Sequence, residues 1–489
     1  MDVFALRERV VGDYRRYIEG FVRIRDERVA AHVEEQFERG VLWPDAILQL
    51  NPAYEPGPTL DELAAGGVIL PATARFFRQP DGGPIRLYRH QQEAVEIAKR
   101  WEPYVLSTGT GSGKSLTYLI PIYDHIARTQ PEKQCVRAII VYPMNALINS
   151  QYTALQAYAA QAGGSQVRFA KYTGQERDEE RQAIQDDPPH ILLTNYVMLE
   201  YMLVRPAERH FTDRATANLE FLVLDELHVH RGRGGADVAM LMRRLRERAG
   251  NPRLLHVGTS ATMASEGSRE ERKRAAAAVA TKLFGVTVPS ENVVDETLRR
   301  VIQAPAPGNA SALRAAVETS LPGESPAAFS SDPLAAWVEE TFGITTENGR
   351  LVRRKPITFA EGARQLREQA EMPARAAGQP DACSAKLQAL LALGNRIRSE
   401  DGEPVFAFRL HQFLAAGGTL YATLEPSQSR YLTLEGQYYA PNGKVLYPLV
   451  FCRECGQEYY LVDLREGKQE DRLMPRLPLL ATGDEEAGA

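Results

Sequence analysis

The sequence predicts an α/β protein built on a doubly wound parallel sheet, and two observations lead to this fold class. From about residue 85 to residue 265, short runs rich in Val, Ile and Leu alternate with helical patterns. These runs lack strict polar alternation, as expected of strands buried on both faces of a sheet. A glycine-rich turn also joins one run to the next helix. The candidate strands span residues 103–107, 136–142, 166–172, 190–194, 219–224 and 253–258.

Changes in composition divide the 489 residues into four expected parts. Residues 1–80 are expected to be an N-terminal helical region, whose aromatic and arginine stripe favours packing on the α/β lobe over nucleic-acid binding. Residues 81–265 form the α/β lobe, and 266–405 a helical insertion with Pro/Gly linkers. Residues 406–489 are expected to be β-rich, with a Cys-x-x-Cys pair and a disordered tail.

Composition limits the classes of partner and compartment. The net charge is −5, with 44% hydrophobic and 25% charged residues, which is typical of a soluble globular protein. A surface for nucleic acid must therefore be a local patch. No apolar run reaches the ~20 residues of a membrane span, and four cysteines do not suggest a disulfide scaffold. We expect a cytoplasmic location.

The glycine-rich turn has the layout of a phosphate-binding P-loop. Its glycines allow backbone N–H groups to converge on an anion at the start of a helix. Lys114 can reach the outer phosphates, and the Ser115 hydroxyl can bind Mg²⁺. The strict motif has glycine where this chain has Thr108. The expected ATP-binding residues are Thr108, Gly109, Thr110, Gly111, Ser112, Gly113, Lys114 and Ser115.

An acidic pair follows the strand predicted at 219–224. Asp225 is placed to hold Mg²⁺, and Glu226 to orient and polarise the attacking water. His228 either couples nucleotide to strand binding or caps the turn. After the next strand, Ser260 and Thr262 can hydrogen-bond across to this acidic box.

Further candidates lie before the P-loop and at other strand ends. Gln91 resembles the glutamine that hydrogen-bonds the adenine edge in helicases of superfamily 2. Polar groups at strand ends, and two cations on an expected flexible loop, can contact a sugar–phosphate backbone, although ordinary turns and a solvated loop are real alternatives. These expected nucleic-acid residues are Pro143, Asn145, Thr194, Arg231 and Arg233.

Cys452 and Cys455 form half of a zinc ribbon. No second Cys-x-x-Cys follows. Cys135 lies in or beside an expected core strand and Cys383 in the insertion, whereas His411 is another candidate ligand. We therefore expect no tightly bound zinc in this chain alone.

The ordered set from Gln91 to Thr262 resembles the first RecA-like lobe of a superfamily 2 DExH helicase. The Asp-Glu-Leu-His box and residues 236–245 resemble Lhr-like helicases related to mitomycin repair factor A. This resemblance implies an ATP-driven motor acting on nucleic acid, DNA more than RNA, with ATP and Mg²⁺ as cofactors, and a role in DNA repair or phage defence. The alternative is an ATP- and nucleic-acid-binding module with little turnover.

The family's second RecA-like lobe carries a Gln-x-x-Gly-Arg-x-x-Arg element, which we do not find after residue 265. We therefore expect the chain to be the front portion of a longer two-lobed motor, with the second lobe in the same protein or in a partner. By itself it is expected to bind its ligands but to unwind poorly.

Overall fold

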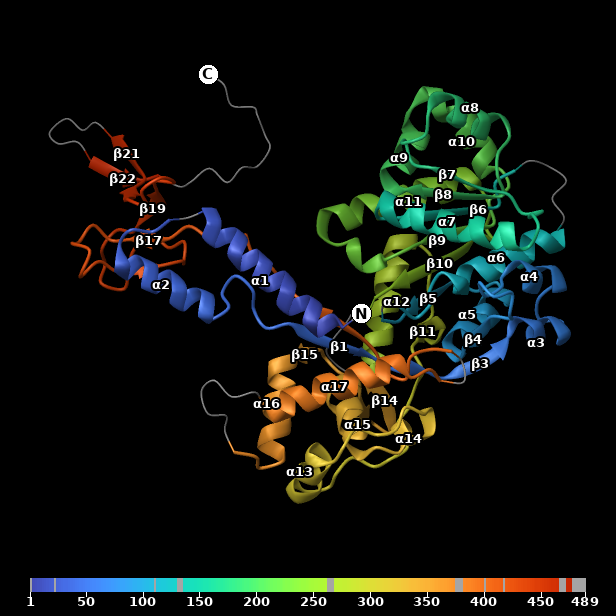
Figure 1. Cartoon of the computed structure of the whole chain (residues 1–489). Helices are drawn as coiled ribbons and strands as arrows, with labels where there is room; N and C mark the ends of the chain where they lie inside the picture. The colour runs from blue at the N-terminus through green and yellow to red at the C-terminus, as the bar shows by residue number, and fades with distance from the viewer. Residues whose placement is uncertain are drawn as a thin grey trace. The chain divides into compact units, whose positions relative to one another are not determined.

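The structure is a computed structural model of the chain (Figure 1). It describes residues 2–21, 23–109, 111–129, 135–261, 268–373, 381–399, 402–416, 418–465 and 472–476. The chain forms two compact units. One comprises residues 53–299 and carries the predicted motifs. The other joins residues 1–52 to residues 300–489.

The unit of residues 53–299 is built on a parallel sheet of seven strands in the order β11-β5-β10-β9-β6-β8-β7. All six predicted strands are present, and the doubly wound RecA-like fold is confirmed. The seventh strand, β11, was not predicted. The strands are β5 (Tyr104–Ser107), β6 (Ala138–Tyr142), β7 (Phe169–Tyr172), β8 (Ile191–Asn195), β9 (Phe221–Leu224), β10 (Leu255–Ser260) and β11 (Val293–Asp295).

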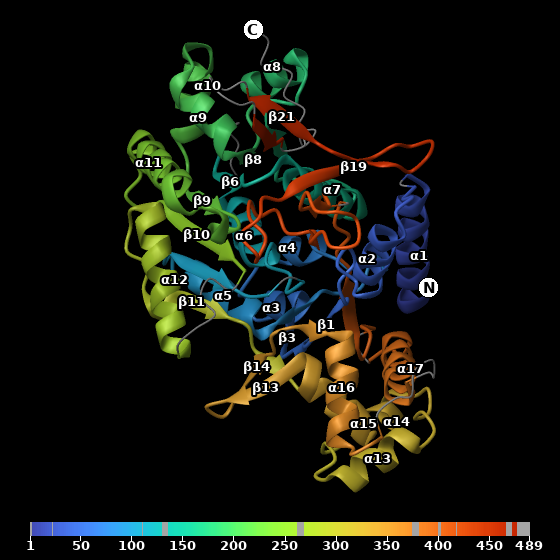
Figure 2. The same cartoon turned by 90° about the vertical axis from the view of Figure 1, so that its left-hand side faces the viewer.

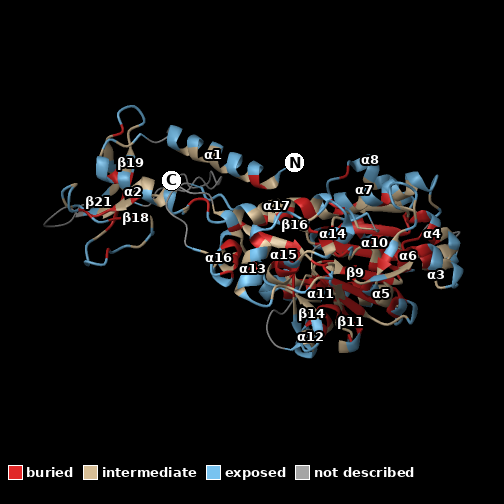
Figure 3. Cartoon of the chain, turned by 60° about the horizontal axis from the view of Figure 1, so that its bottom comes forward, coloured by how far each residue is buried: buried red, intermediate tan, exposed pale blue. Residues whose placement is uncertain are grey.

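Helices cover both faces of this sheet because its strands are apolar on both sides. Alternate residues of one strand enter different cores: Val223 packs with one helical layer and Leu224 with the other. Figure 2 shows α11 and α12 on one side of β9 and β10, and Figure 3 shows the strands buried. The first layer has α3 (Leu60–Ala65), α4 (Pro71–Phe76), α5 (Arg89–Lys99), α6 (Leu116–Thr129) and α7 (Asn145–Gln161); the second has α9 (Tyr196–Val204), α10 (Arg209–Thr216), α11 (Gly232–Ala249) and α12 (Arg269–Phe284).

Short elements complete this unit. Strand β12 pairs with β2, and β3 pairs with β4 just before α5. Pro121 lies inside α6, as expected from the sequence. These elements are β2 (Ala53–Tyr54), β3 (Pro56–Thr59), β4 (Arg86–Tyr88), α8 (Asp178–Asp186) and β12 (Leu298–Arg299).

The second unit has one core formed by segments distant in sequence. Strand β1 lies between β15 and β16, so residues 47–51 pair with residues 407–411. Described helices between residues 310 and 396 pack around these strands, and Phe4 of α1 joins the same core. The elements are α1 (Val3–Phe21), β1 (Ile47–Asn51), α13 (Ala310–Glu318), α14 (Pro326–Ser330), α15 (Pro333–Val338), β13 (Ile344–Glu347), β14 (Arg350–Arg353), β15 (Ile357–Thr358), α16 (Phe359–Gln369), α17 (Ala382–Arg396) and β16 (Ala407–His411).

A smaller core of this unit joins α2 to the β-rich end of the chain. Val29 packs with Leu420, Leu432 and Leu449. The buried Arg430 guanidinium binds Asp26 at 3.1 Å and Glu458 at 3.2 Å. These elements are α2 (Glu27–Glu38), β17 (Tyr421–Ala422), β18 (Leu432–Thr433), β19 (Tyr447–Phe451), β20 (Glu458–Tyr460), β21 (Val462–Arg465) and β22 (Arg472–Pro475).

The units divide the chain at different points from the four expected parts. Residues 53–80 and 268–299 fold with the motif-bearing lobe, because β2 pairs with β12 and β11 extends the sheet beside β5. Residues 1–52 fold with the C-terminal half because β1 pairs with β16. Local sequence patterns do not reveal such long-range pairing. Within the described residues, no helix is both long and apolar enough to cross a membrane.

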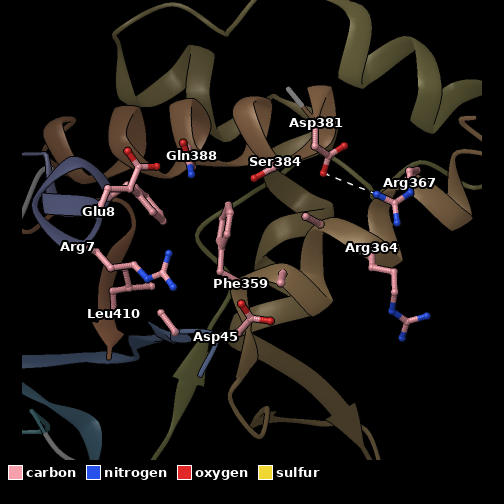
Figure 4. A pocket seen from close by; sticks show the side chains of 14 residues that line it. Arg7, Glu8, Asp45, Phe359, Arg364, Arg367, Asp381, Ser384, Gln388 and Leu410 are labelled. Atoms are coloured by element: carbon pink, nitrogen blue, oxygen red, sulfur yellow. Dashed lines mark ion pairs between the residues drawn. The ribbon is translucent and has the colours of Figure 1, made fainter. Parts of the chain in front are cut away.

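The second unit contains a pocket of about 550 Å³ between α1, α16 and α17 (Figure 4). Arg367 and Asp381 on its wall form an ion pair at 3.8 Å. The Arg364 guanidinium points away from the pocket in this view and binds Glu361 and Glu368. Cations and carboxylates line the pocket together, so its charge favours no class of ligand.

Candidate functional site

The predicted P-loop lies between β5 and α6. Gly111 and Gly113 have φ values of +84° and +67°, a conformation that glycine adopts without strain. The Thr108 and Ser112 hydroxyls, both buried, are 2.6 Å apart and tie the two ends of the turn together. Thr108 therefore has a structural role at the position where the strict motif has glycine. Thr110 lies outside the described residues.

Gln91 lies directly against the P-loop. Its amide nitrogen donates to the carbonyl oxygens of Gly113 at 2.9 Å and Ser112 at 3.3 Å, and its amide oxygen accepts from the Tyr88 N–H at 2.8 Å. A Cβ atom on Gly113 would lie 2.4 Å from the Gln91 amide nitrogen, so this close approach requires glycine. The adenine-binding role of Gln91 stays a prediction.

The acidic pair follows β9 and faces the P-loop. Glu226 has φ +56° and ψ +54°, a left-handed conformation that is costly for a residue with a side chain. The turn brings its carboxylate to the Lys114 ammonium, with distances of 3.1 Å to Oε1 and 3.4 Å to Oε2. Both side chains are largely buried, so the predicted phosphate-binding lysine and the predicted base form a direct ion pair.

Asp225 is the more buried of the two acids. Its carboxylate accepts a hydrogen bond from the Thr259 hydroxyl, which also accepts from the Glu226 N–H at 3.2 Å. Burial raises the pKa of Asp225 to about 6, against the effect of the Thr259 hydrogen bond. The charged form of Asp225 is therefore costly in the protein without a cation beside it.

Two residues of this site carry oxygen donors of the kind that Mg²⁺ takes. Burial is the main cause that raises the pKa of Tyr118; the charge of Asp225 adds to the rise, and a hydrogen bond with the Ser115 side chain opposes it. The Asp225 carboxylate and the Ser115 hydroxyl thus both affect the pKa of Tyr118. A carboxylate and a hydroxyl are the hard oxygen ligands that Mg²⁺ takes, so these residues fit the ion.

His228 links the acidic box to β10. Its Nδ1 lies 3.1 Å from a Glu226 carboxylate oxygen, 3.3 Å from the Ser260 hydroxyl and 3.3 Å from the Ala261 backbone nitrogen. The structure thus brings His228 and Ser260 together, as their expected coupling role requires. Thr262 lies outside the described residues, and it is Thr259 that contacts Asp225.

Sequence reasoning missed three residues of this site. Thr259 is one residue before the Ser-Ala-Thr run, so the position of that run at the end of β10 was a usable signal. His90 contacts the Ser112 carbonyl oxygen at 3.1 Å, next to Gln91. The Glu296 carboxylate accepts from the Gly109 N–H at 3.2 Å, and no sequence signal pointed to it.

The polar strand ends at β6 and β8 lie together beside a pocket of about 520 Å³. The Asn195 amide donates to the Asn145 side chain at 2.7 Å, and both line the pocket with Pro143. Thr194 is fully buried, and its hydroxyl donates to the Tyr172 carbonyl oxygen at 2.6 Å. Asn195 is therefore better placed than Thr194 to meet a ligand here.

The two cations after the acidic box are not on a flexible loop. Helix α11 begins at Gly232, so Arg231 precedes its first residue and Arg233 lies in its first turn. The Arg231 guanidinium donates to the His228 carbonyl oxygen at 3.0 Å. Both arginines are exposed.

Cys452 and Cys455 lie on the turn between β19 and β20. Hydrogen bonds from the backbone N–H groups of Cys455 and Glu454 lower the pKa of the Cys452 thiol. Cys135 and Cys383 are buried elsewhere, and His411 contacts the Gln49 side chain at 3.0 Å. In the described part of the chain, no three His, Cys, Asp or Glu side chains form a group that could hold a metal ion.

Comparison with known proteins shows what the part of the chain that carries this site is similar to. The family model for DEAD/DEAH box helicases matches residues 88–269. The Druantia protein DruE of Escherichia coli (strain UMEA 4076-1) is 26% identical over 91% of this chain and 32% of its own length. The uncharacterized ATP-dependent helicase YprA of Bacillus subtilis (strain 168) is 32% identical over 33% of this chain and 20% of its own length.

A crystal structure of the DUF1998 helicase MrfA bound to DNA is 26% identical to this chain. The match covers 51% of this chain and 32% of that one, with a TM-score of 0.41. The chain thus spans about a third or less of the length of these relatives. Residues 88–269 thus match the DEAD/DEAH box helicase model, and this part of the chain is similar to ATP-dependent helicases.

Proposed function

We propose that this chain is the ATP-binding portion of an ATP-dependent helicase or translocase that acts in the cytoplasm on nucleic acid, DNA rather than RNA. One observation carries the proposal: the P-loop lysine and the acidic-box glutamate lie 3.1 Å apart, on two different strand ends of a RecA-like sheet. A phosphate cradle and a candidate base are thus adjacent. DNA repair or phage defence is the pathway that the family resemblance suggests.

Each residue at this edge has a proposed part in hydrolysis. Bound ATP with Mg²⁺ supplies the phosphoanhydride and a compensating positive charge; Ser115 and Asp225 would hold the cation. Lys114 binds the outer phosphates and leaves Glu226, whose carboxylate is then free to orient water and accept its proton. Gln91 holds the P-loop and reads the adenine edge. His228, which contacts both Glu226 and Ser260, transmits the loss of the Lys114–Glu226 ion pair to the end of β10.

Nucleic acid is proposed to bind across the strand ends of β6 and β8 and the start of α11. Backbone contacts of this kind carry no sequence information, so we expect binding that is independent of sequence and weakened by salt. The residues proposed to contact the strand are Pro143, Asn145, Thr194, Arg231 and Arg233; Asn195 joins them because it lines the same pocket.

A second RecA-like lobe is proposed to complete the motor. Among the described residues, no arginine is an ion-pair partner of Asp225 or Glu226. An arginine finger supplies about 10³–10⁵ in rate in related P-loop enzymes. This observation also favours the second candidate function, an ATP- and nucleic-acid-binding module that turns over slowly until such a lobe is added.

The test is ATP hydrolysis by the purified chain with and without single-stranded DNA or RNA, repeated with a second lobe added in trans. We expect turnover that depends on Mg²⁺ and rises with nucleic acid. Glu226→Gln should abolish it, and Glu179→Gln, an exposed carboxylate on α8, should not. Turnover that persists unchanged in Glu226→Gln would reject the assignment. If the chain binds ATP and nucleic acid but does not hydrolyse ATP, and hydrolysis appears when the second lobe is added, the result would favour the ATP- and nucleic-acid-binding module.

A further inference from the structure

A β-hairpin in the second unit carries a concentration of positive charge that the proposed nucleotide site does not use. Strands β13 and β14 pair in antiparallel register, with Glu347 opposite Arg350 and Ile344 opposite Arg353. Asn348 and Gly349 form the two-residue turn, with φ values of +50° and +77°. Such Asn-Gly turns match the twist of paired strands and hold a hairpin in one register.

The base of the hairpin is anchored in the core of its unit. Ile344 is completely buried, and a Cβ atom on the preceding Gly343 would lie 3.1 Å from the Leu50 side chain. The Arg354 N–H donates to the Gly343 carbonyl oxygen at 2.9 Å, which closes the hairpin where it leaves the core. Its tip, by contrast, is exposed from Thr346 to Arg350. The hairpin is thus anchored at its base in the core of the unit and exposes its tip to solvent.

Three cations on and after β14 are exposed: Arg350, Arg354 and Lys355. No ion pair or side-chain hydrogen bond joins any of them to another described residue. Within residues 344–355 the single carboxylate is Glu347, against four cations. In a chain of net charge −5, Arg350, Arg354 and Lys355 thus form a local group of exposed positive charge.

We propose that this hairpin binds the sugar–phosphate backbone of nucleic acid, as a second contact separate from the strand ends of the sheet. An extended chain rises about 3.3 Å per residue, so Arg350 and Arg354 lie about 13 Å apart. Each strand of a duplex has one phosphate per about 3.4 Å of helix axis, so a hairpin strand lying parallel to that axis would span about four nucleotides between the two arginines. Exposed guanidinium groups bind phosphate oxygens in pairs of hydrogen bonds.

The anion on the hairpin is inferred to be nucleic acid rather than an acidic protein segment. The hairpin presents cations spaced along an extended strand, and its apolar side chains Leu351 and Val352 are only half-exposed. A protein interface would need a larger apolar centre. This inference rests on the proposed function, because it assumes that the chain binds nucleic acid.

The experiment compares the full chain with Arg350→Ala/Arg354→Ala/Lys355→Ala. The control, Arg9→Ala/Arg25→Ala/Arg409→Ala, removes the same charge from exposed arginines of the same unit. Binding of fluorescent single-stranded and duplex oligonucleotides is measured by anisotropy across a range of salt. Loss of three phosphate contacts should weaken binding about tenfold to a hundredfold and reduce the slope of log K against log salt by about 2 for single strands and about 2.7 for duplexes. The control should leave both unchanged.

Equal affinity and salt slope in the hairpin variant and the wild type would overturn the inference and leave an acidic protein partner as the better candidate. A control that weakens binding as much as the hairpin variant would also overturn it, since net charge alone would then explain the loss. If the wild-type chain binds no oligonucleotide, the proposed function itself fails, and the two failures are distinguishable. The melting temperatures of all three proteins show whether each is folded.

Discussion

Replacement of Glu226 by glutamine should have two opposite effects on the nucleotide cycle. The ion pair with Lys114 occupies the ammonium that the phosphates need, at 3.1 Å and 3.4 Å. Glutamine keeps the shape of the side chain but removes the charge. ATP should therefore bind more tightly, because Lys114 no longer has an internal partner. Hydrolysis should nevertheless fall, because glutamine cannot accept the proton of the attacking water.

The size of the first effect follows from the geometry. Two unit charges 3.1 Å apart attract by roughly 5 kcal/mol at an effective dielectric constant of about 20. Desolvation and side-chain ordering offset most of this, so the pair retains about 1 kcal/mol. Since 1.4 kcal/mol is a factor of ten in affinity, ATP should bind about fivefold more tightly to Glu226→Gln. Loss of the general base should reduce turnover by about 10²–10⁴.

Calorimetry with a non-hydrolysable ATP analogue measures the affinity, and phosphate release measures turnover. His228 provides a control, because it also contacts Glu226 but is not expected to bind phosphate. His228→Ala should therefore tighten ATP binding less than Glu226→Gln does. ATP binding that is weaker in Glu226→Gln than in the wild type would refute the competition between the carboxylate and the phosphates.

Three further outcomes are expected. Lys114→Ala should weaken ATP binding at least tenfold in calorimetry, and equal affinity would remove the P-loop assignment. The pKa of Asp225 is raised to about 6, so Mg²⁺-dependent ATP binding should strengthen as pH rises through 6, a step that Asp225→Asn should abolish. Because that pKa lies above the unfolded value, the ligand-free protein binds the proton more tightly when folded, and its unfolding free energy should fall from about pH 4 to 6. Elemental analysis after dialysis against chelator should find less than one zinc per chain, because two cysteines fill only half of a tetrahedral site.

The sequence predicted the sheet well where its signal is local. Strand β9 and the acids after it were evident because a buried apolar run ends abruptly in Asp225 and Glu226. Strand β11 escaped prediction because it has three residues, too few to give a period. The pairing of β1 with β16 joins residues more than 350 positions apart, and no local pattern encodes it.

The features that sequence reasoning missed or misplaced have similar physical explanations. The hairpin at Asn348–Gly349 had a usable signal, since Asn-Gly between β-prone residues is typical of a two-residue turn. Glu296 had none, because its bond to the Gly109 N–H depends on β11 lying beside β5. Thr194 was named for its polarity, but its place in a strand buried on both faces directs the hydroxyl to the Tyr172 carbonyl oxygen.

Several groups proposed to meet ATP already have partners within the protein. Lys114 holds Glu226, Gln91 holds the P-loop carbonyl oxygens, and Thr259 holds Asp225. Nucleotide binding is thus an exchange of partners, so its net free energy is smaller than the new contacts alone would suggest. The exchange also has a direction. Once Lys114 turns to phosphate, His228 is the remaining ion-pair partner of Glu226 among the described residues, and it touches Ser260 at the end of β10. In the proposed function, a change at the phosphates would reach the end of that strand through two side chains, Glu226 and His228.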